Sequence, residues 1–162
     1  MTVANQPQVF VGTPAALIPQ QRARLNAWLA WSEDQSLHVV RLERSAYDSH
    51  PWRQLARYLA RADGVILLGF RQLDARNAIW RPETSEQDSG LGWWTTPWLQ
   101  VEAGMAAALR IPVLVAAEGE VKEGVFSPDV WAPPLYGTAL EAPDSSEWLE
   151  VVRRRWKARA GT

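Results

Sequence analysis

The stretch DGVILLGF, residues 63–70, decides the fold class of this chain, because every residue after Asp63 is apolar or glycine. A short run of this kind is typical of a strand that is covered on both faces, as the central strands of a parallel sheet are. A helical pattern precedes the run over residues 51–62, and another begins at Pro97. The sequence therefore predicts an α/β domain with this segment as its core strand.

Four further apolar segments have the character of strands and lie at residues 8–12, 37–43, 111–118 and 134–140. Amphipathic helical patterns alternate with them, at residues 19–32, 51–62, 96–109 and 145–160. Alternating strands and helices favour a parallel sheet with right-handed crossovers. We expect a single three-layer α/β domain over residues 1–162, with five parallel strands in the order 2-1-3-4-5.

The alternation is interrupted over residues 71–97, a segment of 27 residues that contains Pro82 and the pair Trp93-Trp94. Structureless connections of this length are uncommon within a compact domain and usually carry function or are disordered. We expect a long insert, in the form of a loop, after the third strand. Asp88, Trp93 and Trp94 would belong to a lid whose closure excludes water from a site.

The composition argues against several classes of function. The formal net charge of −1 gives no support for a nucleic-acid surface, and no apolar run reaches the roughly 18 residues of a membrane span. The first residues have neither the basic region nor the apolar stretch of a secretion signal. We therefore expect a cytoplasmic protein without a nucleic-acid or membrane partner.

The chain contains no cysteine, and its two histidines, His38 and His50, are far apart and outside any metal-binding motif. We expect no metal site and no bound cofactor. Ten tryptophans are many for a chain of 162 residues. Core packing is the more common role of a single tryptophan, and this surplus is the only sign in the sequence of a homo-oligomer.

In a sheet of this order, ligands bind beyond the carboxyl ends of the strands, at the switch point between strands one and three. The turn after the first strand supplies Gly12 and Thr13, whose amides and hydroxyl could lie near a phosphate or ribose. The loop after the second strand supplies Tyr47, which could stack on a base. Phe70 and Trp98 could enclose a flat ring. Simple turn formation, chance exposure or core packing explains these residues equally well.

One carboxylate lies in this region, within TTPWLQVEAGMAAAL at residues 95–109. Thr96 is a candidate N-cap, Pro97 suits the first turn, and Glu102 follows one turn inside the predicted helix. The helix dipole and free amides stabilise an anion near such a terminus, so we expect an ionised side chain. A purely structural role, as a dipole partner or a cap, is the alternative.

The segment WLQVEAGMA, residues 98–106, has Trp98 four positions before Glu102. It resembles the Trp-x-x-x-Glu segment of TIR domains and the Glu-x-Gly-x-Ala segment of nucleoside 2-deoxyribosyltransferases. Both families are flavodoxin-like α/β domains that open with a strand comparable to VFVGTP at residues 9–14. The resemblance implies that Glu102 serves the cleavage of an N-glycosidic bond, of NAD in catalytic TIR domains and of a deoxynucleoside in the transferases.

The chain departs from both family patterns. The transferases have an Asp-x-Gly element a few residues ahead of the glutamate, whereas Asp88-Ser89-Gly90 lies fourteen residues before Glu102. The strand VFVGTP lacks the aromatic-polar ending that is usual in TIR domains. The resemblance therefore holds at the level of a superfamily, with Asp88 as a candidate substrate-binding residue.

Cleavage of a ribosyl C–N bond passes through an oxocarbenium-like centre, which an ionised carboxylate beside C1′ can stabilise or trap. Nicotinamide leaves as a neutral molecule and needs little proton donation, so a single ionised Glu102 favours NAD as the substrate. We expect a TIR-like NAD glycohydrolase or cyclase of bacterial defence signalling, with NAD as substrate and not as cofactor. The alternatives are a nucleotide-binding module without turnover and a nucleoside deoxyribosyltransferase.

Overall fold

The computed structural model describes residues 6–42, 51–90, 92–143 and 145–161. The strands of the main sheet are β1 (Gln8–Gly12), β2 (His38–Val40), β3 (Gly64–Gly69), β8 (Val113–Ala117) and β9 (Leu135–Gly137). The α-helices are α1 (Pro19–Asp34), α2 (Pro51–Arg61), α3 (Pro97–Ala108) and α4 (Ser146–Ala160), and two short 3-10 helices are η3 (Gly124–Phe126) and η4 (Pro128–Val130). None of the helices in this described part of the chain combines the length and apolar character needed to cross a membrane.

The main sheet is parallel throughout, and its strand order is β2-β1-β3-β8-β9. Because β8 and β9 are its fourth and fifth strands along the chain, the predicted order 2-1-3-4-5 is confirmed. Val9 of β1 lies opposite Gly64 of β3, and Val65 lies opposite Val113 of β8. All six residues of the central strand β3 are buried, as its apolar sequence predicted. The carboxyl ends of β1 and β3 flank the switch point of the sheet.

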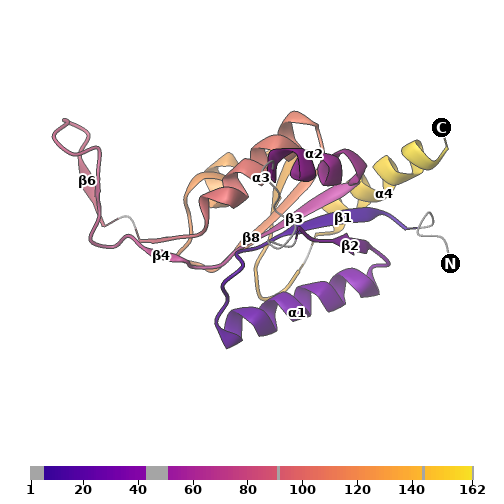
Figure 1. Cartoon of the computed structure of the whole chain (residues 1–162), viewed down its shortest axis with the longest axis horizontal. Coiled ribbons are helices and arrows are strands. Elements are labelled where there is room, and N and C mark those ends of the chain that lie inside the picture. Colours follow the sequence, from indigo (N-terminus) through magenta and orange to yellow (C-terminus); the bar gives the residue numbers. More distant parts are fainter. Residues whose placement is uncertain (1–5, 43–50, 91, 144, 162) are drawn as a thin grey trace.

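Helices cover both faces of this sheet (Figure 1). On one face, α1 and α4 contribute Leu25, Trp28 and Trp148 to a core cluster with the strands. On the other face, α2 and α3 contribute Leu55 and Leu99 to a second cluster. The result is the three-layer, flavodoxin-like arrangement that the alternation of strands and helices predicted.

Two of the ten tryptophans fill the core. Trp28 and Trp148 are each 1% exposed. The indole N–H of Trp28 donates to the carbonyl oxygen of Leu140 at 2.9 Å, and that of Trp148 donates to the carbonyl oxygen of Pro112 at 3.1 Å. Both large rings are therefore buried without leaving a polar atom unsatisfied.

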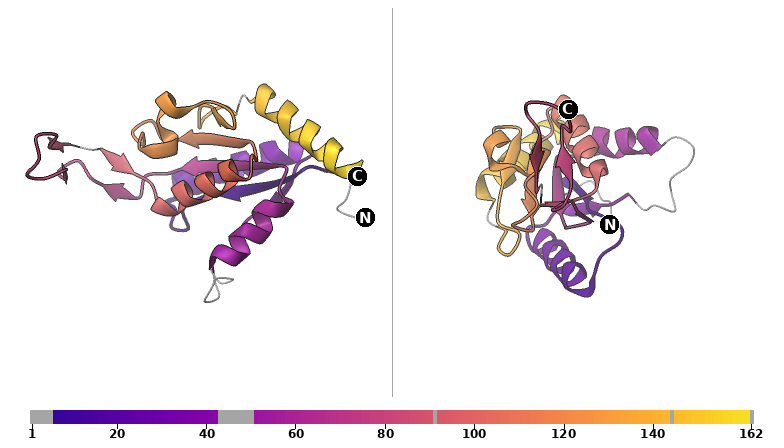
Figure 2. Two further views of the ribbon diagram at one scale, coloured as in Figure 1. Left: turned by 90° about the horizontal axis from the view of Figure 1, so that it is seen from above. Right: turned by 90° about the vertical axis from the view of Figure 1, so that its left-hand side faces the viewer.

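The insert after β3 is not the loop that the sequence predicted. It forms two short antiparallel strand pairs, β4 (Leu73–Asp74) with β7 (Trp93–Trp94) and β5 (Ile79–Trp80) with β6 (Asp88–Ser89). Together these pairs make a narrow hairpin, here called the arm (residues 72–90 and 92–94), which projects away from the sheet and the helices (Figures 1 and 2). The role as a lid stays a prediction, and in this structure cross-strand pairing extends the segment outward and not over the strand ends (Figure 1).

Candidate functional site

Glu102 lies on the face of α3 that packs against the sheet. Thr96 caps the helix, since its hydroxyl oxygen accepts a hydrogen bond from the Trp98 amide at 3.4 Å, and Pro97 occupies the first turn. From this start, the helical repeat brings one set of residues to the buried face, namely Leu99, Glu102, Ala103 and Ala106. Glu102 is only 3% exposed. A carboxyl group therefore occupies a position at which the pattern of the helix calls for an apolar side chain.

The carboxyl group of Glu102 packs directly against the end of β1. A Cβ atom built on Gly12 would lie 2.0 Å from Oε2 of Glu102, so only glycine leaves room for the carboxyl group at this point. The same Oε2 atom is buried and has no hydrogen-bond partner among the described residues. Buried polar atoms are nearly always hydrogen-bonded in folded proteins, so an unsatisfied one calls for a functional explanation.

Glu102 and Gly12 border a cavity of about 530 Å³ beyond the carboxyl end of β1. The remaining lining residues come from β1 and the turn after it, from the chain just after β2, and from the start of α3; they are Phe10, Val11, Thr13, Pro14, Ala15, Arg41, Leu42, Thr96 and Trp98. Small-molecule sites commonly have a volume of this order. The cavity therefore lies at the carboxyl edge of the sheet, beyond β1, and it brings Gly12, Thr13, Trp98 and Glu102 together.

Burial raises the pKa of Glu102 to about 8, and an interaction with the side chain of Trp98 opposes this effect only in part. The expectation of an ionised side chain is therefore wrong near neutral pH. The reason is that the stabilisation of anions falls off within the first turn of a helix, and Glu102 lies beyond it in a site where desolvation of the charge dominates. Neither of these two causes is a positive charge, so no cation among the described residues accounts for the pKa of Glu102.

Trp98 lines the cavity and belongs to an aromatic pair. Trp98 contacts Trp52 of α2, with ring centroids 4.8 Å apart and planes inclined at 40°. Trp52 is 53% exposed, so the pair presents ring surface to the outside. Such a surface suits a flat base or a sugar ring. Trp98 keeps its place among the candidate binding residues, and Trp52 packs against it from outside the cavity lining.

Two predicted binding residues lie away from this cavity, and a third is outside the described residues. Phe70 is 0% exposed and belongs to the core cluster on the α1 side of the sheet, so a ligand cannot reach its ring. Asp88 lies in β6 on the exposed arm, away from the strand ends (Figure 1). Tyr47 lies within residues 43–50, which are outside the described residues. The proposed enclosure of a ring by Phe70 and Trp98 is therefore wrong.

Sequence reasoning missed Arg41, which is the only cationic residue among those lining the cavity in the described part of the chain. None of the ion pairs formed by described residues involves this side chain. Its position directly after β2 is a signal that could have revealed it, because residues after the carboxyl end of any strand in such a sheet face the binding edge. Arg41 gives the cavity a group that can bind an anion.

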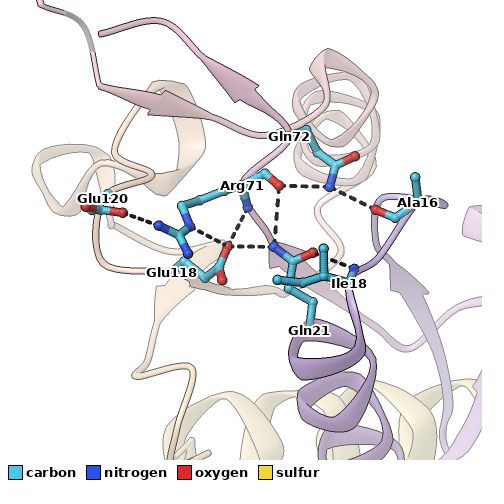
Figure 3. Close-up of polar contacts among 7 residues, drawn as sticks. All are labelled: Ala16, Ile18, Gln21, Arg71, Gln72, Glu118 and Glu120. Carbon is cyan, nitrogen blue, oxygen red and sulfur yellow. Dashed lines mark hydrogen bonds and ion pairs between the residues drawn. The ribbon is translucent and has the colours of Figure 1, made fainter.

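A polar network holds the loop that carries Thr13, Pro14 and Ala15 (Figure 3). Gln21 of α1 is 4% exposed, accepts a hydrogen bond from the Ile18 amide at 3.3 Å, and donates to Oε2 of Glu118 at 3.0 Å. The same Glu118 oxygen accepts from the Arg71 amide at 2.6 Å. The Gln72 side chain donates to the Ala16 carbonyl oxygen at 3.0 Å. The cavity wall is thus tied to the chain that follows both β3 and β8.

The chemistry available to this site comes from few groups. Within the described residues, no three acidic or histidine side chains gather in a way that could hold a metal ion. The cavity offers one buried carboxyl group, one guanidinium group, the threonine hydroxyls and an indole ring. This set can bind a polar ligand with a flat ring and an anionic group, and it places a single acid-base group against that ligand.

Comparisons with known proteins relate the fold to solved structures. No protein-family model matches the sequence, and no curated protein matches it significantly. Among solved structures, a 2-deoxyribosyltransferase of Bacillus psychrosaccharolyticus matches with a TM-score of 0.52 and 12% identity, covering 87% of this chain and 95% of that chain. A likeness of this kind shows the fold, and this fold is the one that the resemblance to nucleoside 2-deoxyribosyltransferases implied.

Two further structures give weaker matches. A CMP N-glycosidase of Clostridium botulinum matches with a TM-score of 0.48 and 12% identity, covering 91% of this chain and 98% of that chain. A 2-deoxyribosyltransferase of Leishmania mexicana matches with a TM-score of 0.46 and 15% identity, covering 68% of this chain and 64% of that chain. The solved structures similar to this chain thus include an N-glycosidase and deoxyribosyltransferases.

Proposed function

We propose that this chain is an enzyme that cleaves the N-glycosidic bond of a nucleoside or a nucleoside monophosphate, with Glu102 as the catalytic carboxyl group. One observation carries the proposal. The carboxyl group of Glu102 is 3% exposed, has an unsatisfied Oε2 atom among the described residues, and borders a cavity of about 530 Å³. Burying a carboxyl group with an unsatisfied oxygen atom costs stability, and strongly shifted pKa values in cavities are typical of catalytic groups.

The proposed reaction starts from the ionised form of Glu102. With a pKa of about 8, about a tenth of the molecules hold this form at pH 7. As the C1′–N bond breaks, positive charge develops on the sugar, and a carboxylate shielded from water stabilises that charge strongly. The positive charge on the sugar also lowers the pKa of Glu102, so a larger fraction of this group is ionised in the transition state.

The bond changes then follow in two steps. A carboxylate oxygen of Glu102 forms a bond to C1′ while the base leaves with the bonding electrons and takes a proton from water. A water molecule or a second base next attacks C1′ and gives its proton to the hydroxide left by the first step, the ester bond to Glu102 breaks, and the carboxylate is restored. Attack by water makes the enzyme a nucleoside hydrolase, and attack by a base makes it a transferase.

The substrate class is inferred from Arg41 and from the fold. The proposed reaction uses ionised Glu102 whichever base leaves, so the pKa of this group does not distinguish NAD from a nucleoside. Arg41 supports a substrate with an anionic group, because a guanidinium binds phosphate oxygens well. The shared fold with a 2-deoxyribosyltransferase agrees with a nucleoside substrate. A nucleoside 5′-monophosphate combines a sugar, a flat base and an anion in one molecule of suitable size.

A substrate panel tests the proposal. The purified chain is incubated with ribonucleosides, deoxynucleosides, their 5′-monophosphates and NAD, and the free base is measured by chromatography. We expect base release from at least one nucleoside or monophosphate, and a loss of about 100-fold or more in Glu102→Gln. The control is Glu150→Gln on α4, an exposed carboxylate away from the cavity, which should keep full activity.

The remaining outcomes separate the alternatives. Arg41→Ala should raise KM for a monophosphate and leave KM for the matching nucleoside unchanged. Exchange of the released base for free adenine identifies a transferase. Thermal stabilisation by a nucleotide without any product would instead support a binding module without turnover. Undiminished base release by Glu102→Gln would overturn the mechanism.

A further inference from the structure

The arm carries apolar side chains that contact little of the rest of the chain. Leu73 lies opposite Trp94 in the β4–β7 pair, and the ring of Trp80 lies 6.2 Å from that of Trp94. Leu73 is 57% exposed and Trp80 is 45% exposed. We call Leu73, Trp80 and Trp94 the arm patch. An isolated two-stranded hairpin is marginally stable in water, and contiguous exposed apolar groups mark interaction sites.

The arm is acidic at its tip. Two ion pairs lie along it, Asp74 with Arg76 at 2.5 Å and Arg81 with Glu86. Glu83 and Asp88 take part in none of the ion pairs that described residues form. The far end of the hairpin therefore presents two carboxylates that the arm does not neutralise.

The root of the arm has the opposite character. A groove of about 590 Å³ lies where the arm meets α1, and we call it the root groove. Its lining includes the apolar residues Ala16, Leu17 and Trp93 and the cationic residues Arg22 and Arg71. Arg71 is paired with Glu118 at 3.4 Å and with Glu120 at 2.7 Å, so the remaining positive charge of the groove is that of Arg22. Arg22 is exposed and takes part in none of the described ion pairs.

We propose that two copies of this chain associate through their arms, which run antiparallel about a two-fold axis. This arrangement buries the arm patch of each copy against the other arm. It also brings the acidic tip of each arm to the cationic root groove of the other. An isologous interface requires a self-complementary surface, and one arm here supplies both charges and the apolar part.

The alternative arrangements fit less well. Parallel arms would bring Glu83 and Asp88 of one copy close to the same carboxylates of the other, and like charges in contact are unfavourable. A nucleic acid or an anionic membrane would be repelled by the acidic tip. A second copy is the one partner for which this chain itself supplies the matching surface.

Two sets of variants test the proposal by sedimentation velocity of the full chain over a range of concentrations. The patch variant is Leu73→Ser with Trp80→Ser, and its matched control is Leu109→Ser, a leucine that is 48% exposed at the end of α3. We expect a dimer for the unmodified chain and for the control, and a dissociation constant raised by about tenfold or more in the patch variant.

A charge exchange provides the second test, and it uses only exposed residues whose substitution leaves the fold intact. Glu83→Lys with Asp88→Lys should weaken the dimer, and so should Arg22→Glu alone, by about tenfold each. Combining all three should restore association to within a few-fold of the unmodified chain, because the tip and the groove are again opposite in sign. A chain that is monomeric at every concentration, or a triple variant as weak as the two charge variants, would overturn the proposal.

Discussion

Replacing Glu102 by glutamine should make the protein more stable, and increasingly so as the pH rises. In the folded state, burial raises the pKa of this carboxyl group from 4.5 to about 8, so the folded chain holds the proton more tightly than the unfolded chain does. Between these two values the unfolded state is the more ionised one. The stability of the unmodified protein therefore falls as the pH rises from 4.5 toward 8.

The size of the effect follows from the same shift. Each pKa unit corresponds to about 1.4 kcal/mol, so the free energy of unfolding should lose about 4 kcal/mol through this group between pH 5 and pH 8.5. The glutamine variant has no proton to lose and keeps nearly the same volume. Its advantage over the unmodified protein should grow by about this amount over the same pH range, a large part of the ~5–15 kcal/mol typical of a domain.

Urea unfolding of both proteins at several pH values measures the difference, because all other titrating groups cancel in the comparison. Glu150→Gln serves as the control, since an exposed carboxylate should change stability by less than about 0.5 kcal/mol at any pH. Parallel stability curves for the unmodified protein and Glu102→Gln would show that the carboxyl group is not desolvated in solution. The predicted pH-dependent loss of stability and the proposed catalytic role of Glu102 with a raised pKa would then both fail.

Three further predictions concern the site and the opposite end of the sheet. kcat/KM should rise with pH and level off above about 8, because the proposed reaction uses the ionised form of Glu102 in the free enzyme; a profile that falls through this pH would identify it as a proton donor instead. Gly12→Ala should abolish base release and cost about 1–3 kcal/mol of stability, because its Cβ would lie 2.0 Å from Oε2 of Glu102. The control is Gly104→Ala, whose Cβ would have no atom within 4 Å; it should leave activity intact and stabilise the helix slightly. Asp63→Ala should lower the unfolding free energy by about 3 kcal/mol in denaturant melts without changing KM. The reason is that this fully buried carboxylate accepts a hydrogen bond from the Gln8 amide at 2.9 Å and pairs with Arg159 at 3.0 Å. A loss of stability below about 1 kcal/mol would contradict this account.

The arm shows why sequence patterns misjudge some inserts. Residues 71–97 contain glycine, proline and many polar residues, which is also the composition of a loop. The strand pairs within it are only two residues long, and such pairs have no detectable alternation. Cross-strand contacts such as Leu73 with Trp94 hold the hairpin together, and these contacts join positions far apart in the chain.

The candidate site was partly within reach of the sequence. The strand ends and the start of α3 placed Gly12, Thr13, Trp98 and Glu102 in one crevice, and the cavity contains all four. Arg41 was missed although it follows a strand end. Phe70 was placed wrongly because a residue after a strand can turn either toward the site or under the sheet, and periodicity alone does not distinguish these directions.

The architecture could be predicted from the sequence, because an apolar central strand and the alternation of helices with strands are local patterns that allow few parallel arrangements. The sequence also indicated where on the sheet a site would lie, since that follows from the strand order. The protonation of Glu102, in contrast, could be inferred only from the folded structure. A pKa depends on how much water reaches the group and on which charges face it, and both are set by residues such as Gly12 that are distant in the chain.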